Sequence, residues 1–360
     1  MDTAPTLEDE QFQTDILIGV SRTFALTIPQ LPGVLRRAVG NAYLLCRIAD
    51  TIEDDPEMSK DEKVRFSDWF VSILQGAEGH IHFENDLSSS LAASTPIAEK
   101  ELIESSGRVL RITHDLRTTQ KSAITRCVLT MTKGMMYYQG KETLDGLADQ
   151  NEMDRYCYYV AGVVGEMLTE LFCDYCPELE PKKELLLPLS VSFGQALQMT
   201  NILKDVWIDQ ERGACWLPRT TFQKHGVSFK TLVPENGGEP FRNFMLDMLA
   251  TAYGHLSNAL SFTLLLPRNQ TGIRRFCLWA LGMSLLTIKK IGKNPNFTHG
   301  SQVKISRRSV KITALATSFF AMSNTALKLL FKTSALGVHK KEIKTPLDSI
   351  SDLTIHKKQN

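Results

Sequence analysis

The chain has 360 residues, of which 43% are hydrophobic and 22% are charged, values typical of a globular protein with one large or two small domains. Its formal net charge of +1 excludes a general electrostatic attraction to nucleic acid. Its seven scattered cysteines indicate reduced thiols in a cytosolic protein rather than a disulfide framework.

The N-terminal segment is acidic and polar, so it predicts neither a signal peptide nor a transit peptide. We expect residues 1–14 to form a frayed lead and Phe12–Val20 to begin the first helix. Ser21-Arg-Thr-Phe24 then breaks that helix with small hydroxyl residues. From the residues alone, Ser21 and Thr23 are helix caps.

The stretch from Tyr43 to Asp55 begins as an apolar helical run and ends in acids. Asp50, Glu53 and Asp54 are spaced i, i+3 and i+4, so a helix places them on one face. Like charges at this spacing disfavour a helix by roughly 0.2–0.5 kcal/mol per pair. The pattern is compatible with an exposed acidic helix end and with a bound cation. Arg47 is expected to form an ion pair with one of these acids.

The following segments alternate between helical and loop patterns. Ser59–Gln75 has an apolar face at helical spacing, which predicts an amphipathic helix. Residues 76–96 are rich in Gly, Ser, Asn and His and are expected to be a surface connection. Helices are expected again at about Ile97–Leu110 and Ile124–Gln139.

A further helix is expected from Glu152 to Phe172. Tyr156, Val160 and Val164 share one of its faces, and the small residues Ala161 and Gly165 are four positions apart. Small residues at this spacing indicate either close helix packing or the wall of a cavity.

Asn201, Asp205 and Asp209 form a second polar stripe, at the end of a helix expected from Leu185 to Asp209. Two carboxylate clusters on two helices suggest a shared divalent ion. The candidate ligands are all oxygen atoms, which favours Mg²⁺, an ion that completes its coordination with water and phosphate oxygens. The implied substrate is a phosphate or diphosphate ester.

The C-terminal third reads as more helices followed by a polar tail. Lys289–Ser309 is a basic segment, and a basic run is usually a solvated face. Ile312–Phe331 has the length of a membrane span but carries several polar residues, so a packed helix is expected instead. We expect one domain over residues 15–333 and a mobile tail over residues 334–360.

Four of these segments resemble the motifs of the squalene and phytoene synthase family. Asp50-Thr-Ile-Glu-Asp54 and Asn201 to Asp209 resemble its two aspartate-rich motifs. Tyr156 to Gly165 resembles its central motif, and Ser21-Arg-Thr-Phe24 its N-terminal motif. The resemblance implies an all-α, single-domain isoprenoid-synthase fold with helices around a deep central cavity.

The same resemblance implies roles for individual residues. The catalytic residues are expected to be Tyr156, which transfers a proton, and the acids Asp50, Asp54, Asp205 and Asp209. The metal ligands are expected to be Asp50, Glu53, Asp54, Asn201, Asp205 and Asp209. The substrate diphosphate is expected to contact Ser21, Arg22, Thr23, Arg47, Asn201 and Arg212. The cavity is expected to be lined by Phe24, Tyr43, Val160, Val164, Gln198 and Phe276.

The implied activity is that of a prenyltransferase of isoprenoid metabolism, on the way to sterols or hopanoids. It condenses two molecules of farnesyl diphosphate head to head with Mg²⁺, giving presqualene diphosphate, and then reduces this product to squalene with NADPH. Lys304, Arg307 and Arg308 resemble the segment that squalene synthases use for NADPH. The chain has no G-x-G-x-x-G motif, so the dinucleotide site is not of the Rossmann type.

Two alternatives stay open at this stage. The first is a phytoene- or dehydrosqualene-type synthase that uses no reductant, and the second is a non-catalytic relative that acts as a binding or assembly factor. We expect a cytoplasmic protein with no transmembrane span and no nucleic-acid partner. A peripheral contact with a membrane is compatible with release of a hydrocarbon product.

Overall fold

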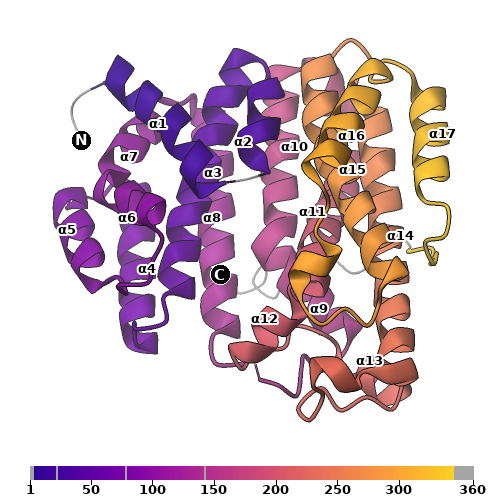
Figure 1. The fold of residues 1–360 in the computed structure, drawn as a ribbon. Coiled ribbons are helices and arrows are strands. Elements are labelled where there is room, and N and C mark those ends of the chain that lie inside the picture. Colours follow the sequence, from indigo (N-terminus) through magenta and orange to yellow (C-terminus); the bar gives the residue numbers. More distant parts are fainter. Residues whose placement is uncertain (1–3, 22, 78, 142, 344–360) are drawn as a thin grey trace. The chain divides into compact units, whose positions relative to one another are not determined.

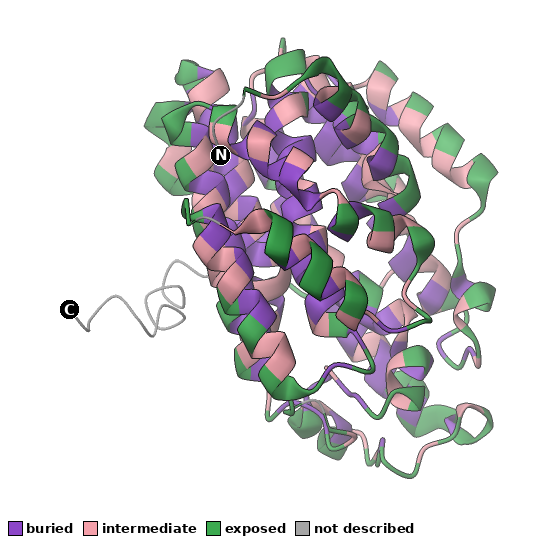
Figure 2. Cartoon of the chain, turned by 90° about the vertical axis from the view of Figure 1, so that its left-hand side faces the viewer, coloured by how far each residue is buried: buried purple, intermediate pink, exposed green. Residues whose placement is uncertain are grey.

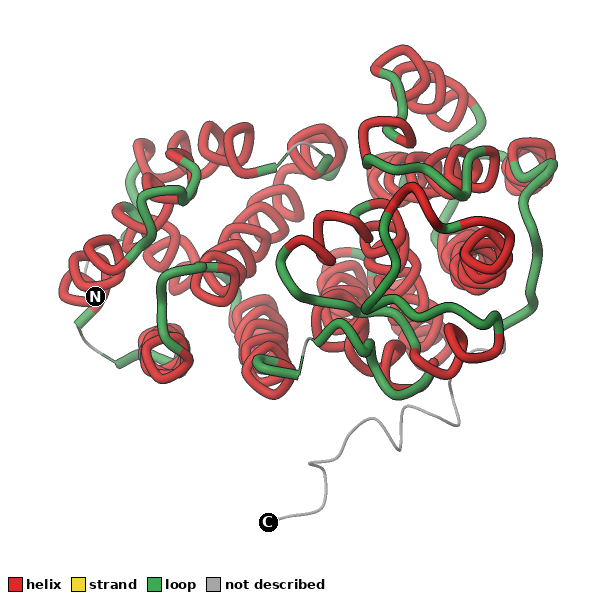
Figure 3. The backbone as a smooth tube through the Cα atoms, turned by 60° about the horizontal axis from the view of Figure 1, so that its bottom comes forward, coloured by secondary structure: helices red, strands yellow, loops and turns green. Residues whose placement is uncertain are grey.

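The computed structural model describes residues 4–21, 23–77, 79–141 and 143–343. Within these ranges the secondary structure is helical, with no strand, and loops join the helices (Figures 1 and 3). The prediction of an all-α protein is therefore confirmed. The described residues form two compact units, which are treated separately below.

The first unit comprises the described parts of Met1–Gln139 together with Glu170–Pro177. Its helices are α1 (Leu7–Val20), α2 (Phe24–Thr27), α3 (Gly33–Asp54), α4 (Lys60–Leu74), α5 (His80–Ser90), α6 (Ile97–Glu104), α7 (Ser106–Asp115) and α8 (Thr118–Tyr138). Helix α3 is central, because it packs against α1, α4, α6, α7 and α8. In both units the buried residues follow the helix faces that meet other helices (Figure 2).

Helix α1 begins at Leu7, so the expected frayed lead over residues 1–14 is wrong for residues 7–14. The reason is a capping box in which Thr6 and Asp9 exchange side-chain and backbone hydrogen bonds. Arg111 on α7 then donates two hydrogen bonds to the Asp9 carboxylate, at 2.7 and 3.1 Å. Only 2% of Asp9 is exposed, and these contacts lower the pKa of its carboxyl to about 2, chiefly through the hydrogen bonds from Arg111.

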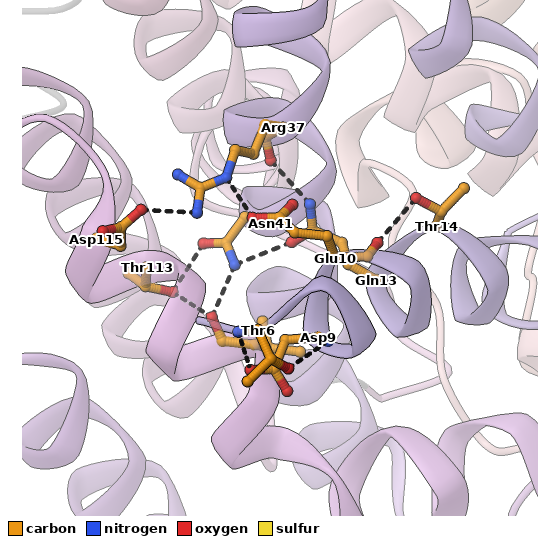
Figure 4. A network of polar contacts seen from close by, with 10 residues as sticks. Thr6, Asp9, Glu10, Gln13, Thr14, Arg37, Asn41, Thr113 and Asp115 are labelled. Atoms are coloured by element: carbon orange, nitrogen blue, oxygen red, sulfur yellow. Dashed lines mark hydrogen bonds and ion pairs between the residues drawn. The ribbon is translucent and has the colours of Figure 1, made fainter. Parts of the chain in front are cut away.

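A buried polar network fixes α3 between α1 and α7 (Figure 4). The amide nitrogen of Asn41 donates to the side-chain oxygen of Gln13 at 3.1 Å and to the carbonyl of Val109 at 2.8 Å. The Thr113 hydroxyl donates to the amide oxygen of Asn41 at 2.7 Å. Asn41 is fully buried, and leaving its polar groups unpaired would destabilise the fold. The network therefore sets the position of the helix that carries the first acidic motif.

The low pKa of Asp9 predicts acid-sensitive folding. A carboxyl whose pKa lies below its unfolded value stabilises the protein above that unfolded value, and the stabilisation is lost as the pH falls toward about 2. We expect Asp9→Asn to lower the free energy of unfolding by about 2–3 kcal/mol at pH 7, and by much less near pH 2. Denaturant unfolding at both pH values measures this difference. A loss that is equal at the two pH values would show that packing, not charge, is the cause.

The loop expected over residues 76–96 contains a helix, so this prediction is wrong. Helix α5 occupies His80–Ser90, and its Phe83 and Leu87, four positions apart, are both fully buried. Phe83 stacks on Phe70 of α4 with ring centroids 5.8 Å apart. Two buried side chains thus hold a helix in a sequence whose Gly, Ser and Asn content favours a loop.

The second unit comprises the described parts of Gly140–Thr169 and Glu178–Asn360. Its helices are α9 (Gln150–Cys157), the start of α10 (Val163–Tyr175), α11 (Lys183–Lys204), α12 (Val206–Glu211), α13 (Arg219–Lys224), α14 (Gly238–Leu265), α15 (Thr271–Lys293), α16 (Arg307–Phe319) and α17 (Asn324–Ser334). Helix α11 is central here and packs against α9, α14 and α15.

The helix expected from Glu152 to Phe172 is interrupted by a π-helical turn at Tyr158–Gly162. This segment packs tightly on α11. A methyl group at Gly165 would overlap the carbonyl of Ser190, and one at Gly194 would overlap the carbonyl of Ala161. Close helix packing therefore explains the small residues of the central motif.

Two more expected helices are divided. The helix expected over Leu185–Asp209 is divided at Asp205, which lies between α11 and α12. The i to i+4 backbone hydrogen bonds nevertheless continue from Asn201 through Asp209. The segment Ile312–Phe331 forms parts of α16 and α17 with a turn between them. No described helix is long and apolar enough to cross a membrane.

A fully buried arginine holds the turn between α16 and α17. The Arg274 guanidinium donates to the carbonyls of Thr263 and Leu266, at the end of α14, at 2.8 and 2.7 Å. It also donates to the carbonyl of Ala321 at 2.6 Å and to the side-chain oxygen of Asn324 at 2.7 Å. The end of α14 and the α16–α17 turn are thus joined by one side chain.

Candidate active site

The first group of candidate residues lies on α3. Tyr43, Arg47, Asp50 and Asp54 recur every three or four residues, so the helix presents them along one side. Residues between them, such as Leu44 and Ile48, are fully buried. Burial of that apolar face orients the polar side, on which Asp50 is half-buried and Asp54 exposed.

Arg47 is the centre of this group. Its guanidinium donates to the Tyr43 hydroxyl at 3.1 Å and lies 3.7 Å from the Asp50 carboxylate and 4.0 Å from Glu99 of α6. The Thr51 hydroxyl donates to the Arg47 carbonyl and to Glu99, at 2.8 and 3.2 Å. The Nε of Arg47 is buried and has no hydrogen-bond partner among the described residues. A buried donor of this kind is expected to have an acceptor in the functional state, and a ligand oxygen would supply one.

The Asp50 carboxyl is perturbed. Burial raises its pKa to about 6; Arg47 opposes this shift, whereas Asp54 and Glu99 add to it. The negative charge of Asp50 is therefore unfavourable in the protein alone, and a bound cation would stabilise it.

The N-terminal motif is close to the same helix. Ser21 follows the last residue of α1, and its hydroxyl accepts the backbone N–H of Phe24, the first residue of α2, at 2.9 Å. Thr23 is half-buried and makes no capping bond. Phe24 packs on Tyr43 with ring centroids 5.3 Å apart, and Tyr43 donates to the carbonyl of Val20 at 3.1 Å. Arg22 lies outside the described residues.

The second group is at the junction of α11 and α12. Asn201 is exposed, and Asp205 and Asp209 are half-buried. The Lys204 ammonium lies 3.1 Å from the Asp205 carboxylate and 3.5 Å from the side-chain oxygen of Asn201. This lysine balances the charge of Asp205 in the protein alone. Arg212, at the end of α12, is exposed.

Tyr156, near the end of α9, stacks on Trp216. Their rings are parallel within 3°, with centroids 4.0 Å apart. Trp216 belongs to the segment after α12, and this segment is hydrogen-bonded to the residues before α9. The N–H of Leu147 donates to the carbonyl of Leu217 at 3.0 Å, and that of Arg219 donates to the carbonyl of Leu147 at 2.7 Å. These bonds fix the tryptophan against the tyrosine.

The basic segment lies next to the second acidic motif. The Trp207 indole of α12 donates to the carbonyl of Phe297 at 2.6 Å. A methyl group at Gly300 would lie 3.9 Å from a carboxylate oxygen of Asp205. Lys304, Arg307 and Arg308 follow on exposed positions. The start of this basic segment is therefore close to the second carboxylate motif.

Magnesium fits the donors that are present. No group of three or more His, Cys, Asp or Glu side chains that could hold a metal ion occurs among the described residues. Each motif taken alone thus provides at most a pair of carboxylates. Mg²⁺ accepts one or two carboxylates and takes its other ligands from water and phosphate, so a substrate diphosphate would complete the site. The raised pKa of Asp50 marks a carboxyl whose charged form a bound cation would stabilise.

The remaining predicted residues are distributed as follows. Val160 lies in the π-helical turn and Val164 in α10, and both are half-buried. Gln198 on α11 is half-buried, whereas Phe276 on α15 is 4% exposed. The carbonyl of Glu53 accepts a hydrogen bond from Lys63 at 2.6 Å. Their assignment to the cavity or to the metal stays a prediction.

Two residues with evident roles were not predicted from the sequence. Glu99 is 48 positions away from Thr51 along the chain, and no pattern connects them. Trp216 could have been proposed from the sequence, because it is an aromatic residue in the short segment that directly follows the second acidic motif.

Solved structures show which fold the chain has. A ligand complex of a protein named TcSQS matches with a TM-score of 0.74 at 23% identity, covering 96% of both chains. A dehydrosqualene synthase in complex with a ligand matches with a TM-score of 0.63 at 18% identity, covering 91% of this chain and 97% of the other. The chain therefore has the all-α fold of these synthases.

Sequence comparison gives the family. The sequence model of the squalene/phytoene synthase family matches residues 17–309. The squalene synthase of Schizosaccharomyces pombe is 29% identical over 287 residues, which are 78% of this chain and 59% of that protein. Squalene synthase 1 of Arabidopsis thaliana is 30% identical over 305 residues, 82% of this chain and 68% of that protein. The match thus spans about three fifths of the length of the S. pombe relative. The chain belongs to the squalene/phytoene synthase family.

Proposed function

We propose that the chain is a squalene synthase. It joins two molecules of farnesyl diphosphate head to head into presqualene diphosphate, with release of one diphosphate. It then converts this intermediate to squalene, with loss of the second diphosphate and a hydride from NADPH. The observation that carries the proposal is the group around Arg47. There a buried guanidinium N–H, without a partner in the described part of the chain, adjoins a carboxyl of raised pKa. Such a site could bind an anion together with a cation. The relatives of the chain cited above are named squalene synthases.

In this proposal, both acidic motifs act on substrate diphosphate. Asp50, Asp54, Asp205 and Asp209 would hold Mg²⁺, which neutralises the diphosphate and makes it a better leaving group. Arg47 contributes its free Nε–H as a donor to a phosphate oxygen. Ser21 and Thr23 contribute hydroxyls at the N-terminal motif, and Tyr43 keeps Arg47 in place through its hydroxyl.

The loss of diphosphate leaves an allylic cation, which aromatic faces stabilise at roughly 0.5–2 kcal/mol each. Tyr43 and Tyr156 are the candidate faces. Tyr156 also has a hydroxyl that can receive or deliver a proton, and its ring orientation is fixed by the stack on Trp216. Released diphosphate is the proposed partner base for the proton lost when the two prenyl chains join.

The reductive step distinguishes this proposal from the phytoene- and dehydrosqualene-type alternative. Lys304, Arg307 and Arg308 are exposed cations that would bind the phosphates of NADPH. Support for this assignment is that their segment begins beside Asp205 of the second acidic motif. NADPH supplies the hydride of the second half-reaction.

Product analysis tests the proposal. Purified full-length protein is incubated with farnesyl diphosphate and Mg²⁺, with and without NADPH, and the products are identified by mass. We expect squalene only with NADPH, presqualene diphosphate without it, and no diphosphate release in excess EDTA. The same hydrocarbon in both tubes would identify a synthase without a reductive step. Absence of diphosphate release under every condition would favour a non-catalytic relative.

The Tyr156–Trp216 stack leads to a prediction for catalysis. Trp216→Ala removes the ring that orients Tyr156, and a misplaced catalytic group lowers kcat by about 10- to 100-fold with little change in KM. Trp216→Phe retains an aromatic face and should keep most of the activity. Steady-state kinetics of both variants measure the effect, and thermal unfolding confirms that each is folded. Full activity of Trp216→Ala would show that the stack is not needed.

A further inference from the structure

The C-terminal part of the chain lacks acidic residues. No Asp or Glu occurs between Asp247 and Glu342. The Lys and Arg residues in this interval are Arg268, Arg274, Arg275, Lys289, Lys290, Lys293, Lys304, Arg307, Arg308, Lys311, Lys328, Lys332, Lys340 and Lys341. The whole chain has a net charge of only +1, so acidic residues elsewhere balance the basic residues of this interval. The excess of positive charge therefore lies in α15, α16 and α17 and the segments next to them.

Helix α16 buries polar side chains and exposes large apolar ones, which is the opposite of an ordinary surface helix. It packs on α15 through threonines: Thr317 is 6% exposed, and a methyl group at Gly282 of α15 would overlap Thr313. Its outer face carries large apolar side chains instead. Leu315 is 72% exposed and Phe319 is 82% exposed, and the two are four residues apart. A surface helix normally buries such residues, so this exposed apolar face indicates an interaction surface.

The apolar surface continues around the turn and onto α17. Met322 in the turn and Leu329 and Leu336 farther on are all exposed by more than half. The turn is held by Arg274 through the hydrogen bond to Ala321, so Met322 is displayed by a well-packed segment. Figure 1 shows α16 and α17 as two neighbouring helices joined by this turn. We call Ile312, Leu315, Phe319, Met322, Leu329 and Leu336 the apolar ridge.

Basic side chains accompany the ridge. Lys311 lies four residues before Leu315 on the outer side of α16, and Lys328 and Lys332 flank Leu329 on α17; all three lysines are exposed. Large apolar residues beside lysines, with no acid nearby in sequence, are typical of helices that lie in the interface of an anionic bilayer. The ridge also lies beyond residue 309, where the family match ends.

We propose that the apolar ridge and its lysines dock the protein on an anionic lipid bilayer. The apolar side chains enter the headgroup region, and the lysines contact lipid phosphates. A protein partner or a second copy of the chain is less favoured, because a surface with lysines and no acids repels its own copy. The exposed apolar residues of the first unit contrast with the ridge. Ile97, at 85% exposure, is followed closely by Glu99 and Glu101.

Vesicle flotation with the full-length protein tests this inference. The vesicles consist of phosphatidylcholine alone or of phosphatidylcholine with half of the lipid replaced by phosphatidylglycerol. We expect binding to the anionic vesicles that weakens in high salt. The double variant Leu315→Ser with Phe319→Ser should lower the partition coefficient at least about tenfold. Both side chains are exposed, so the thermal unfolding temperature should not fall.

Two further variants separate the contributions. Neutralising Lys311, Lys328 and Lys332 with glutamine should weaken binding to anionic vesicles several-fold and leave any binding to phosphatidylcholine unchanged. Ile97→Ser is the matched control, since it removes an equally exposed apolar residue from an acidic region, and it should bind as the unmodified protein does. The inference is overturned if the unmodified protein does not float, or if the serine double variant floats equally well. It is also overturned if light scattering shows a dimer that this variant dissociates, because the ridge would then bind a second copy.

Discussion

Replacement of Asp50 by asparagine is expected to reduce diphosphate release by at least about a thousandfold while the protein stays folded. Asparagine keeps the size of the side chain but removes the charge that would hold Mg²⁺. The carboxyl of Asp50 already has a pKa raised to about 6 by burial, so its loss should leave the free energy of unfolding unchanged or slightly higher. The release of diphosphate from farnesyl diphosphate and the thermal unfolding temperature measure the two effects.

Asp205→Asn should give the same result if the second acidic motif serves the same reaction.

Asp55 offers a matched control next to the first motif. Its buried carboxylate accepts the backbone N–H groups of Glu57, Met58 and Ala92 at 2.8–3.0 Å, so its role in the structure is to fix the chain after α3. Asp55→Ala should therefore destabilise the protein. Retained activity in Asp50→Asn, or a loss of stability as large as that in Asp55→Ala, would mean that Asp50 is a structural residue.

Arg274→Met is expected to lower the free energy of unfolding by about 3–5 kcal/mol. The guanidinium donates to three carbonyls and to the side chain of Asn324, and all of these acceptors lose a partner in the variant. Methionine fills a similar volume, so the loss reports the hydrogen bonds more than a cavity. Denaturant unfolding measures it.

The neighbouring arginine provides the control for this prediction. Arg275 is half-buried, and its Nε makes no hydrogen bond to any residue that the structure describes. Arg275→Met should change the free energy of unfolding by about 1 kcal/mol or less. Equal losses for the two variants would mean that the hydrogen bonds of Arg274 do not stabilise the turn.

The sequence predicted the parts of the site that follow helical spacing. Asp50 and Asp54 share one side of α3 because they are four positions apart on one continuous helix, and this periodicity is visible in the sequence. Asp205 and Asp209 kept their predicted spacing even though the helix is divided at Asp205, because the i to i+4 hydrogen bonds continue there.

Features that depend on contacts between distant segments were not predictable. Glu99 on α6 approaches Arg47 on α3, and nothing in the sequence of either helix indicates that the two helices are in contact. Helix α5 depends on Phe83 packing against α4, whereas its Ser and Asn content favours a loop. The turn that divides Ile312–Phe331 depends on Arg274, which lies 47 positions before Ala321.

The π-helical turn at Tyr158–Gly162 has a consequence for how the central motif is aligned with distant relatives. A π turn contains one residue more than an α turn, and one residue corresponds to about 100° of rotation around the helix axis. In an unbroken α-helix Tyr156 and Val164, eight positions apart, would lie about 80° apart around the axis, so the extra residue of the π turn brings the two positions closer to one side. Deleting one residue from the turn would restore a regular helix and leave the positions on either side of it facing as they do now. A one-residue gap at this place in an alignment is thus compatible with an unchanged arrangement of Tyr156 and of the residues after the turn.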